Sequence, residues 1–112
     1  MRATLLIPTL NEGESIGHVL RTFQAAAAEA NRTLFAGDPV DWELLVIDGN
    51  STDGTPERAR AAGAQVLAEA RRGYGRAYRT GFAAANGEFI ATLDGDATYP
   101  AELVPKLLHH LL

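Results

Sequence analysis

Two aspartates in the last quarter of the chain, Asp94 and Asp96, have a spacing that suits a shared divalent cation. In an extended segment, residues two apart project their side chains to the same side. Carboxylate oxygens are preferred ligands of Mg²⁺ and Mn²⁺, which keep further positions for water and phosphate. The same pair is equally compatible with a capping turn before a helix that starts near Pro100. Spacing alone therefore leaves a metal pair and a turn as alternatives.

A second segment whose residue types could bind a ligand spans residues 71–76, with the sequence RRGYGR, and is rich in arginine and glycine. It does not match the dinucleotide-binding pattern, because Tyr78 stands where the third glycine belongs, and the chain has no phosphate-loop Gly-Lys-Ser/Thr. Ordinary dehydrogenases and kinases are thereby excluded. Backbone N–H groups at a helix start and guanidinium groups favour a diphosphate ligand. The alternative is a surface loop whose arginines pair with the chain's own acids.

Two more polar segments lie earlier in the chain, at residues 8–12 (PTLNE) and 48–54 (DGNSTDG). Each follows a short apolar run of the kind that forms a buried strand. Taken singly, each is typical of an Asx-rich turn. All four polar segments share one feature, which is that each follows a predicted strand.

The strands that position these segments are predicted from apolar runs bounded by Pro or Gly, with Pro8 ending the first. A helix is indicated between the first two strands by apolar residues at helical spacing. We expect Thr52 or Thr55 to cap the second helix, and Pro105 to lie close to the start of the fourth. The predicted strands are residues 4–7, 43–47, 65–67 and 88–93, and the predicted helices are 14–31, 56–62, 76–85 and about 100–111.

The alternation of strands and helices predicts an α/β fold of Rossmann-like type, with a mostly parallel four-stranded sheet and helices on both faces. In such a sheet all the strands point the same way. The segments that follow them therefore reach one common edge, which is the usual ligand site of open α/β folds. We expect the four polar segments to meet there.

Composition narrows the function classes further. A chain of 112 residues with 46% hydrophobic and 21% charged residues is expected to form one globular domain. The absence of cysteine excludes disulfide scaffolds and thiolate zinc sites. A net charge of −4 argues against nucleic acid as a partner, and no apolar run approaches the length of a membrane span. The cytoplasm is the expected compartment.

Four motifs in register resemble the N-terminal half of family-2 inverting glycosyltransferases with the GT-A fold, and most resemble polyprenyl-phosphate mannosyl- or glucosyltransferases. The motifs are LLIPTLNEGESI, VIDGNSTDGT, RRGYGRAYRTGF and ATLDGDATYP. The resemblance implies that residues 1–112 are the nucleotide-sugar-binding half of such a domain. It also implies an enzyme that transfers a hexose from a GDP- or UDP-hexose to a polyprenyl phosphate at the cytoplasmic face of the membrane, in cell envelope biogenesis.

The resemblance also implies site residues. Asp94 and Asp96 match the Asp-x-Asp motif that holds Mg²⁺ or Mn²⁺ on the diphosphate, where the metal and arginines stabilise the leaving group in direct displacement at the anomeric carbon. Glu12 and Asp48 fall in the base and ribose region. The full set of predicted nucleotide-binding residues is Pro8, Thr9, Asn11, Glu12, Asp48, Asn50, Ser51, Arg72, Gly73, Gly75, Arg76, Asp94 and Gly95.

In that family the acceptor-binding region lies downstream of the helix that follows the Asp-x-Asp motif, whereas the present sequence stops at Leu112. We therefore expect no sugar transfer by these residues alone, and a nucleotide-sugar-binding module without activity is the alternative function. A nucleotidyltransferase is disfavoured because its glycine-rich N-terminal signature is missing. We also expect self-association, because a half-sheet leaves a strand edge and an apolar helix face without neighbours.

Overall fold

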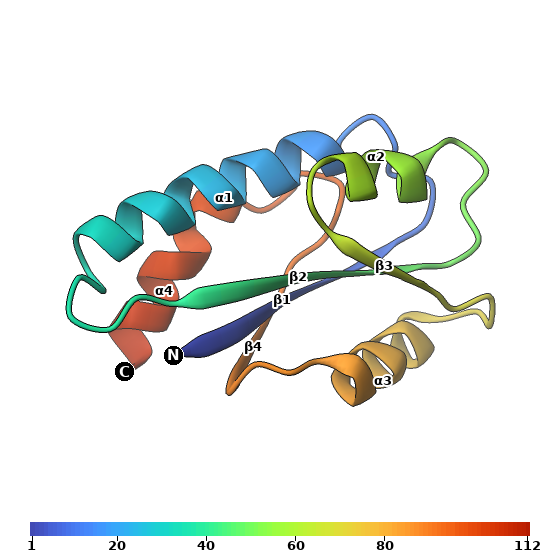
Figure 1. Cartoon of the computed structure of the whole chain (residues 1–112). Helices are drawn as coiled ribbons and strands as arrows, with labels where there is room; N and C mark the ends of the chain where they lie inside the picture. The colour runs from blue at the N-terminus through green and yellow to red at the C-terminus, as the bar shows by residue number, and fades with distance from the viewer.

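The computed structural model describes all residues, 1–112, and shows four strands that alternate with helices (Figure 1). Every pair of neighbouring strands is parallel, and the order in the sheet is β3-β2-β1-β4. This confirms the predicted α/β fold with a parallel sheet. The elements are β1 (Arg2–Thr9), α1 (Ile16–Arg32), β2 (Asp41–Asp48), α2 (Thr55–Ala61), β3 (Gln65–Ala68), α3 (Tyr74–Ala84), β4 (Phe89–Thr92), the 3₁₀ helix η1 (Ala101–Leu103) and α4 (Val104–Leu111).

Helices cover both faces of the sheet, as predicted (Figure 1). On one face, side chains such as Leu5 and Val46 pack with Phe23 of α1 in the main core, which also includes residues of α2 and η1. On the other face, Leu6 and neighbouring residues of β2 pack against α3. Successive side chains of β1 thus point into the cores on opposite faces of the sheet, as expected for the two-residue repeat of a strand. None of the helices combines the length and apolar character that a membrane span requires.

The first strand is longer than predicted, because it continues through Pro8 to Thr9 in register with Ile47 and Asp48. The backbone of Leu6 faces β4, since Leu93 N donates to its carbonyl oxygen at 3.1 Å. Pro8, two residues on, faces the same side, but the pairing with β4 has ended by then at Leu6. The missing N–H of proline therefore costs no ladder hydrogen bond, and the expectation that Pro8 ends the strand was wrong.

The predicted threonine cap of α2 was also wrong. Gly54 occupies the capping position with a left-handed φ of 87°, and the N–H of Thr55 in the first turn donates to Asp53 Oδ1 at 3.1 Å. Thr55 is instead the first residue of α2. The fourth helix splits into η1 and α4, with Pro105 in the first turn of α4, where its fixed φ is compatible with a helix. Thus Pro105 does lie near a helix start, as predicted.

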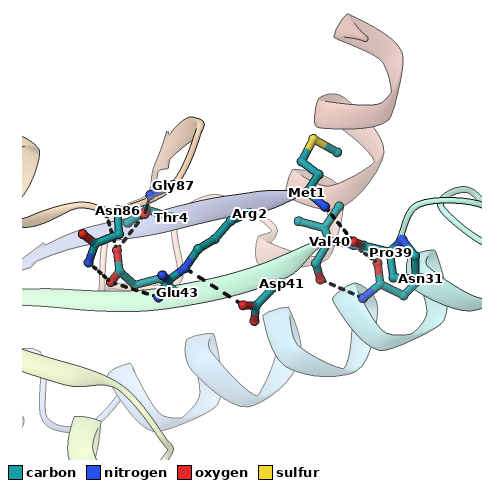
Figure 2. A network of polar contacts seen from close by, with 10 residues as sticks. All are labelled: Met1, Arg2, Thr4, Asn31, Pro39, Val40, Asp41, Glu43, Asn86 and Gly87. Atoms are coloured by element: carbon teal, nitrogen blue, oxygen red, sulfur yellow. Dashed lines mark hydrogen bonds and ion pairs between the residues drawn. The ribbon is translucent and has the colours of Figure 1, made fainter.

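A polar network at the opposite, amino-terminal edge of the sheet links β1, β2 and the turn before β4 (Figure 2). The Glu43 carboxylate accepts hydrogen bonds from Thr4 Oγ1 at 2.8 Å, Asn86 N at 2.9 Å and Asn86 Nδ2 at 3.0 Å. Arg2 lies 3.8 Å from it. Burial alone would raise the pKa of Glu43, but these hydrogen bonds and the Arg2 charge together hold it below its ordinary value.

We expect Glu43→Gln to lower the free energy of unfolding by about 1–3 kcal/mol at neutral pH, because it removes charge-assisted hydrogen bonds from a buried position. The pKa is lowered in the folded state, so the stabilisation is present above the ordinary value of 4.5 and is lost as the pH falls through the folded value. Urea unfolding across this range should show the two proteins converging in acid. Glu88→Gln, at an exposed carboxylate without partners, is the control. A constant difference at every pH would contradict this account.

Candidate functional site

All four polar segments were expected to meet at the carboxyl edge of the sheet, and three of them do. They follow β1, β2 and β4. Ser15 Oγ, which lies between the segment after β1 and α1, donates to the carbonyl oxygen of Gly95 in the segment after β4 at 2.5 Å. Gly95 itself is packed so closely that an added Cβ would lie 3.0 Å from Cγ2 of Thr9. The Asp94-Gly95-Asp96 turn is therefore held directly against the end of β1.

The fourth segment, residues 71–76, is connected to this cluster through Glu69, which precedes it in the chain. Glu69 N donates to the Asp48 carbonyl oxygen at 2.8 Å, and Arg71 Nε pairs with the Glu69 carboxylate at 2.5 Å. Arg71 thus behaves as the surface-loop alternative expects. Arg72 and Arg76 are exposed and form no ion pair with any acid of the chain. Their guanidinium groups remain available to an anionic ligand.

Residues 11–13 are joined to residues 51–55 by a row of hydrogen bonds. Three consecutive backbone N–H groups donate to side-chain oxygens, which are Ser51 Oγ at 2.8 Å, Thr55 Oγ1 at 2.9 Å and Asp53 Oδ2 at 2.9 Å. Thr52 N returns a hydrogen bond to Asn11 Oδ1 at 2.9 Å. These three N–H groups are therefore already used and are not free to cradle a phosphate.

Asp48 lies beneath this junction and is only 3% exposed. Its carboxylate accepts hydrogen bonds from Thr9 Oγ1 at 2.8 Å, Ser51 Oγ at 2.7 Å and Ser51 N at 2.8 Å. The side chain therefore fixes the ends of β1 and β2 relative to each other. Its predicted contact with a nucleoside stays a prediction.

The predicted site residues differ in how far they reach the surface. The buried ones, which shape the backbone, are Pro8, Thr9, Asp48 and Gly95. Those of intermediate exposure are Glu12, Ser51 and Asp94. The exposed ones are Asn11, Asn50, Arg72, Gly73, Gly75, Arg76 and Asp96.

A polar cavity of about 560 Å³ opens between the first segment, the start of α2 and the Asp94–Asp96 turn, and no hydrophobic side chain lines it. Two predicted nucleotide-binding residues and one predicted metal ligand contribute to it, while four lining residues were not predicted. The lining residues are Asn11, Glu12, Glu14, Ser15, Asp53, Arg58 and Asp96. Asp53 could have been found, because it falls inside the polar segment 48–54. Arg58 could not, because it lies in the expected second helix with no local signal.

A second cavity, of about 360 Å³, lies on the other side of the same turn and is largely apolar. Asp94 lines it together with Tyr78, Tyr99, Leu103 and other residues of η1 and α4. The two aspartates thus line neighbouring cavities. The extended conformation expected for them was wrong, because Gly95 and Asp96 form a turn in which Thr98 N donates to Asp96 Oδ1 at 3.0 Å.

Negative charge is concentrated around Glu12. Burial is the main cause that raises its pKa, and the nearby carboxylates of Asp96, Asp94 and Asp53 add to the effect. By contrast, hydrogen bonds from Thr98 lower the pKa of Asp96, so this carboxylate stays ionised near neutral pH. The turn therefore presents anionic oxygen atoms to whatever binds beside it.

No group of three or more His, Cys, Asp or Glu side chains is placed to hold a metal ion by itself. The oxygen donors of Asp94 and Asp96 nevertheless fit Mg²⁺ or Mn²⁺, because these ions are commonly bound by one or two carboxylates together with water and substrate phosphates. A ligand that brings its own phosphates would complete such a coordination shell. The donor set therefore suits a metal that arrives with a diphosphate.

Comparison with known proteins places the chain in a family. Residues 4–112 match the family named Glycosyl transferase family 2. An uncharacterized glycosyltransferase of Mycobacterium tuberculosis is 38% identical over 96% of this chain and 43% of its own length. The undecaprenyl-phosphate 4-deoxy-4-formamido-L-arabinose transferase of Klebsiella pneumoniae is 34% identical over 96% of this chain and 32% of its own length.

Solved structures of similar proteins agree with this family assignment. The crystal structure of M. tuberculosis glucosyl-3-phosphoglycerate synthase in complex with Mn²⁺, UDP and glucosyl-3-phosphoglycerate has a TM-score of 0.75 and 32% identity, over 98% of this chain and 39% of that one. This likeness confirms the predicted GT-A fold. The chain spans less than half the length of each of these relatives. With its four motifs matched in one continuous region, it belongs to glycosyl transferase family 2.

Proposed function

We propose that this chain binds the nucleoside diphosphate of a UDP-sugar with a divalent cation at the carboxyl edge of its sheet. The protein would transfer the hexose to an acceptor with inversion. The observation that carries this proposal is the meeting of the segments after β1, β2 and β4 around one polar cavity that Asp96 lines. The complex of a similar synthase with Mn²⁺ and UDP supports UDP as the nucleotide rather than GDP.

In this proposal Asp94 and Asp96 hold Mg²⁺ or Mn²⁺, which when bound neutralises the charge that develops on the leaving diphosphate. Arg72 and Arg76, which have no acid partners in the chain, would bind the same diphosphate. Asn11, Glu12 and Asn50 border the nucleoside, while the buried residues Thr9 and Asp48, together with the half-buried Ser51, keep the two loops beneath it in place.

The acceptor we propose is a phosphate-bearing molecule. One similar enzyme is named for undecaprenyl phosphate, and another is solved with phosphoglyceric acid. On a polyprenyl phosphate the phosphate itself is the nucleophile, and with a second pKa of about 6 it is largely dianionic at neutral pH, so it attacks the anomeric carbon with little help from a general base. A transfer assay with UDP-hexose and Mn²⁺ should offer polyprenyl phosphate, 3-phosphoglycerate and a phosphate-free alcohol separately. Product on the phosphate-free alcohol alone would contradict this proposal.

We expect UDP binding to depend on the divalent cation. Without the cation, the carboxylates of Asp94 and Asp96 repel a diphosphate, whereas with it they become ligands of a shared ion. The double change Asp94→Ala plus Asp96→Ala should abolish the metal-dependent part of the affinity, measured by calorimetric titration of UDP with Mn²⁺ and with a chelator. Asp41→Ala plus Glu88→Ala removes the same charge from the opposite edge of the sheet and should change little. Equal binding of UDP in chelator by the unaltered chain would refute the metal assignment.

We expect Asp48→Ala to weaken UDP binding with or without metal, and also to lower the free energy of unfolding by about 1–3 kcal/mol, because it leaves buried donors unpaired. Thr9→Val is the matched control, since it removes one donor to the same carboxylate but keeps the charge and the shape. The affinity for UDP and the unfolding midpoint should be measured for both variants. If both lose affinity equally, Asp48 acts only through the fold.

A further inference from the structure

We propose that Arg58 is a positioning residue of the donor site, which keeps the loop after β1 in place by binding the carbonyl oxygen of Gly13. The inference rests on the proposed function, because this loop carries Asn11 and Glu12. Arg58 Nη1 donates to Gly13 O at 2.7 Å, across 45 residues of sequence. Arg58 also lines the polar cavity that contains Asp96.

The backbone around Gly13 is fixed on both sides of its Cα. Gly13 N donates to Asp53 Oδ2 at 2.9 Å, and Gly13 O accepts from Arg58. Gly13 is buried, and an added Cβ would lie 2.8 Å from the Asp53 carbonyl oxygen. The loop therefore packs directly on the segment before α2. A change in its hydrogen bonds would shift the neighbouring Glu12 side chain, which faces the cavity.

Arg58 has a rigid base. Thr55 and Ala59, on the same short helix, are both 0% exposed and anchor α2 in the core. The guanidinium folds back over the start of the helix, since an added Cβ at Gly54 would lie 3.9 Å from Arg58 Nε. The long side chain of Arg58, on the helix that follows β2, can thus hold the loop that follows β1.

The charges around Arg58 indicate a geometric role. It is the only basic residue lining the polar cavity, beside the four acids Glu12, Glu14, Asp53 and Asp96. Even so, it forms no ion pair with any of them. Its one hydrogen bond goes to a neutral carbonyl oxygen, so the place of the guanidinium is set by the loop backbone rather than by the acids.

The test compares Arg58→Met with Arg60→Met, a matched control on the same helix whose exposed side chain has no partner. Arg58→Met should weaken the affinity for UDP in the presence of Mn²⁺ by roughly tenfold, as for other residues that orient ligand-binding groups from behind. Arg60→Met should leave it unchanged. The salt dependence of UDP binding should be the same in all three proteins, because a positioning residue makes no ion pair with the ligand. A weaker salt dependence in Arg58→Met would mean direct phosphate contact and would overturn the positioning role.

Amide hydrogen exchange measures how well the loop after β1 is held in the protein without any ligand. Exchange at Asn11, Glu12 and Gly13 should quicken in Arg58→Met but not in Arg60→Met, while the core of β1 stays protected in both. Arg58→Lys can still donate to Gly13 O and should recover most of the affinity and protection. Unaltered exchange or affinity in Arg58→Met overturns the inference. Failure of the wild-type chain to bind UDP would instead overturn the proposed function, and the donor role of Arg58 with it.

Discussion

The buried hydrogen bond from Thr9 Oγ1 to Asp48 Oδ1 is the interaction on which the geometry of the carboxyl edge depends. These residues end the two central strands and stand opposite each other in register. Burying a carboxylate costs free energy unless its oxygen atoms accept hydrogen bonds. Two further hydrogen bonds to Asp48 come from Ser51 N and Ser51 Oγ, in the turn that directly follows β2. Asn50 takes a left-handed φ of 70° within this turn. The turn then directs residues 51–55 against the loop after β1.

This constraint divides the candidate site into two parts. The loops after β1 and β2 are held by the chain's own hydrogen bonds, so their shape exists before any ligand binds. Arg72, Arg76 and Asp94, in contrast, have no side-chain hydrogen bond or ion pair within the chain. The groups proposed to meet a cation and a diphosphate are therefore those left without internal partners. A diphosphate with a bound cation would pair with these arginines and this aspartate. The loops after β1 and β2 would lose little conformational freedom when it binds, because their shape is already fixed.

Local patterns in the sequence were sufficient for the sheet and its edge, because runs such as Leu44–Ile47 bury on both faces of a parallel sheet. They failed where a distant contact decides the local structure. Pro8 stays within β1 because β4 has already ended beside it. Thr55 does not cap α2 because its hydroxyl instead accepts the N–H of Glu12, 43 residues away. Arg58 was missed for the same reason, since its partner Gly13 lies on another loop.

The segment of Asp94 and Asp96 adopts a turn, which was one of the two alternatives for this pair, while the metal pair stays a prediction. Its backbone is a turn, stabilised by the hydrogen bond from Thr98 N to Asp96. The middle residue, Gly95, lies against Thr9 Cγ2 and Glu12 Cγ, where a Cβ would sit 3.0 and 3.3 Å away. Any side chain there would push the turn off the end of β1. Asp94 and Asp96 therefore flank a closely packed glycine, and each lines a different cavity. The position of both aspartates at the edge of the sheet therefore depends on how closely this turn approaches the loop after β1.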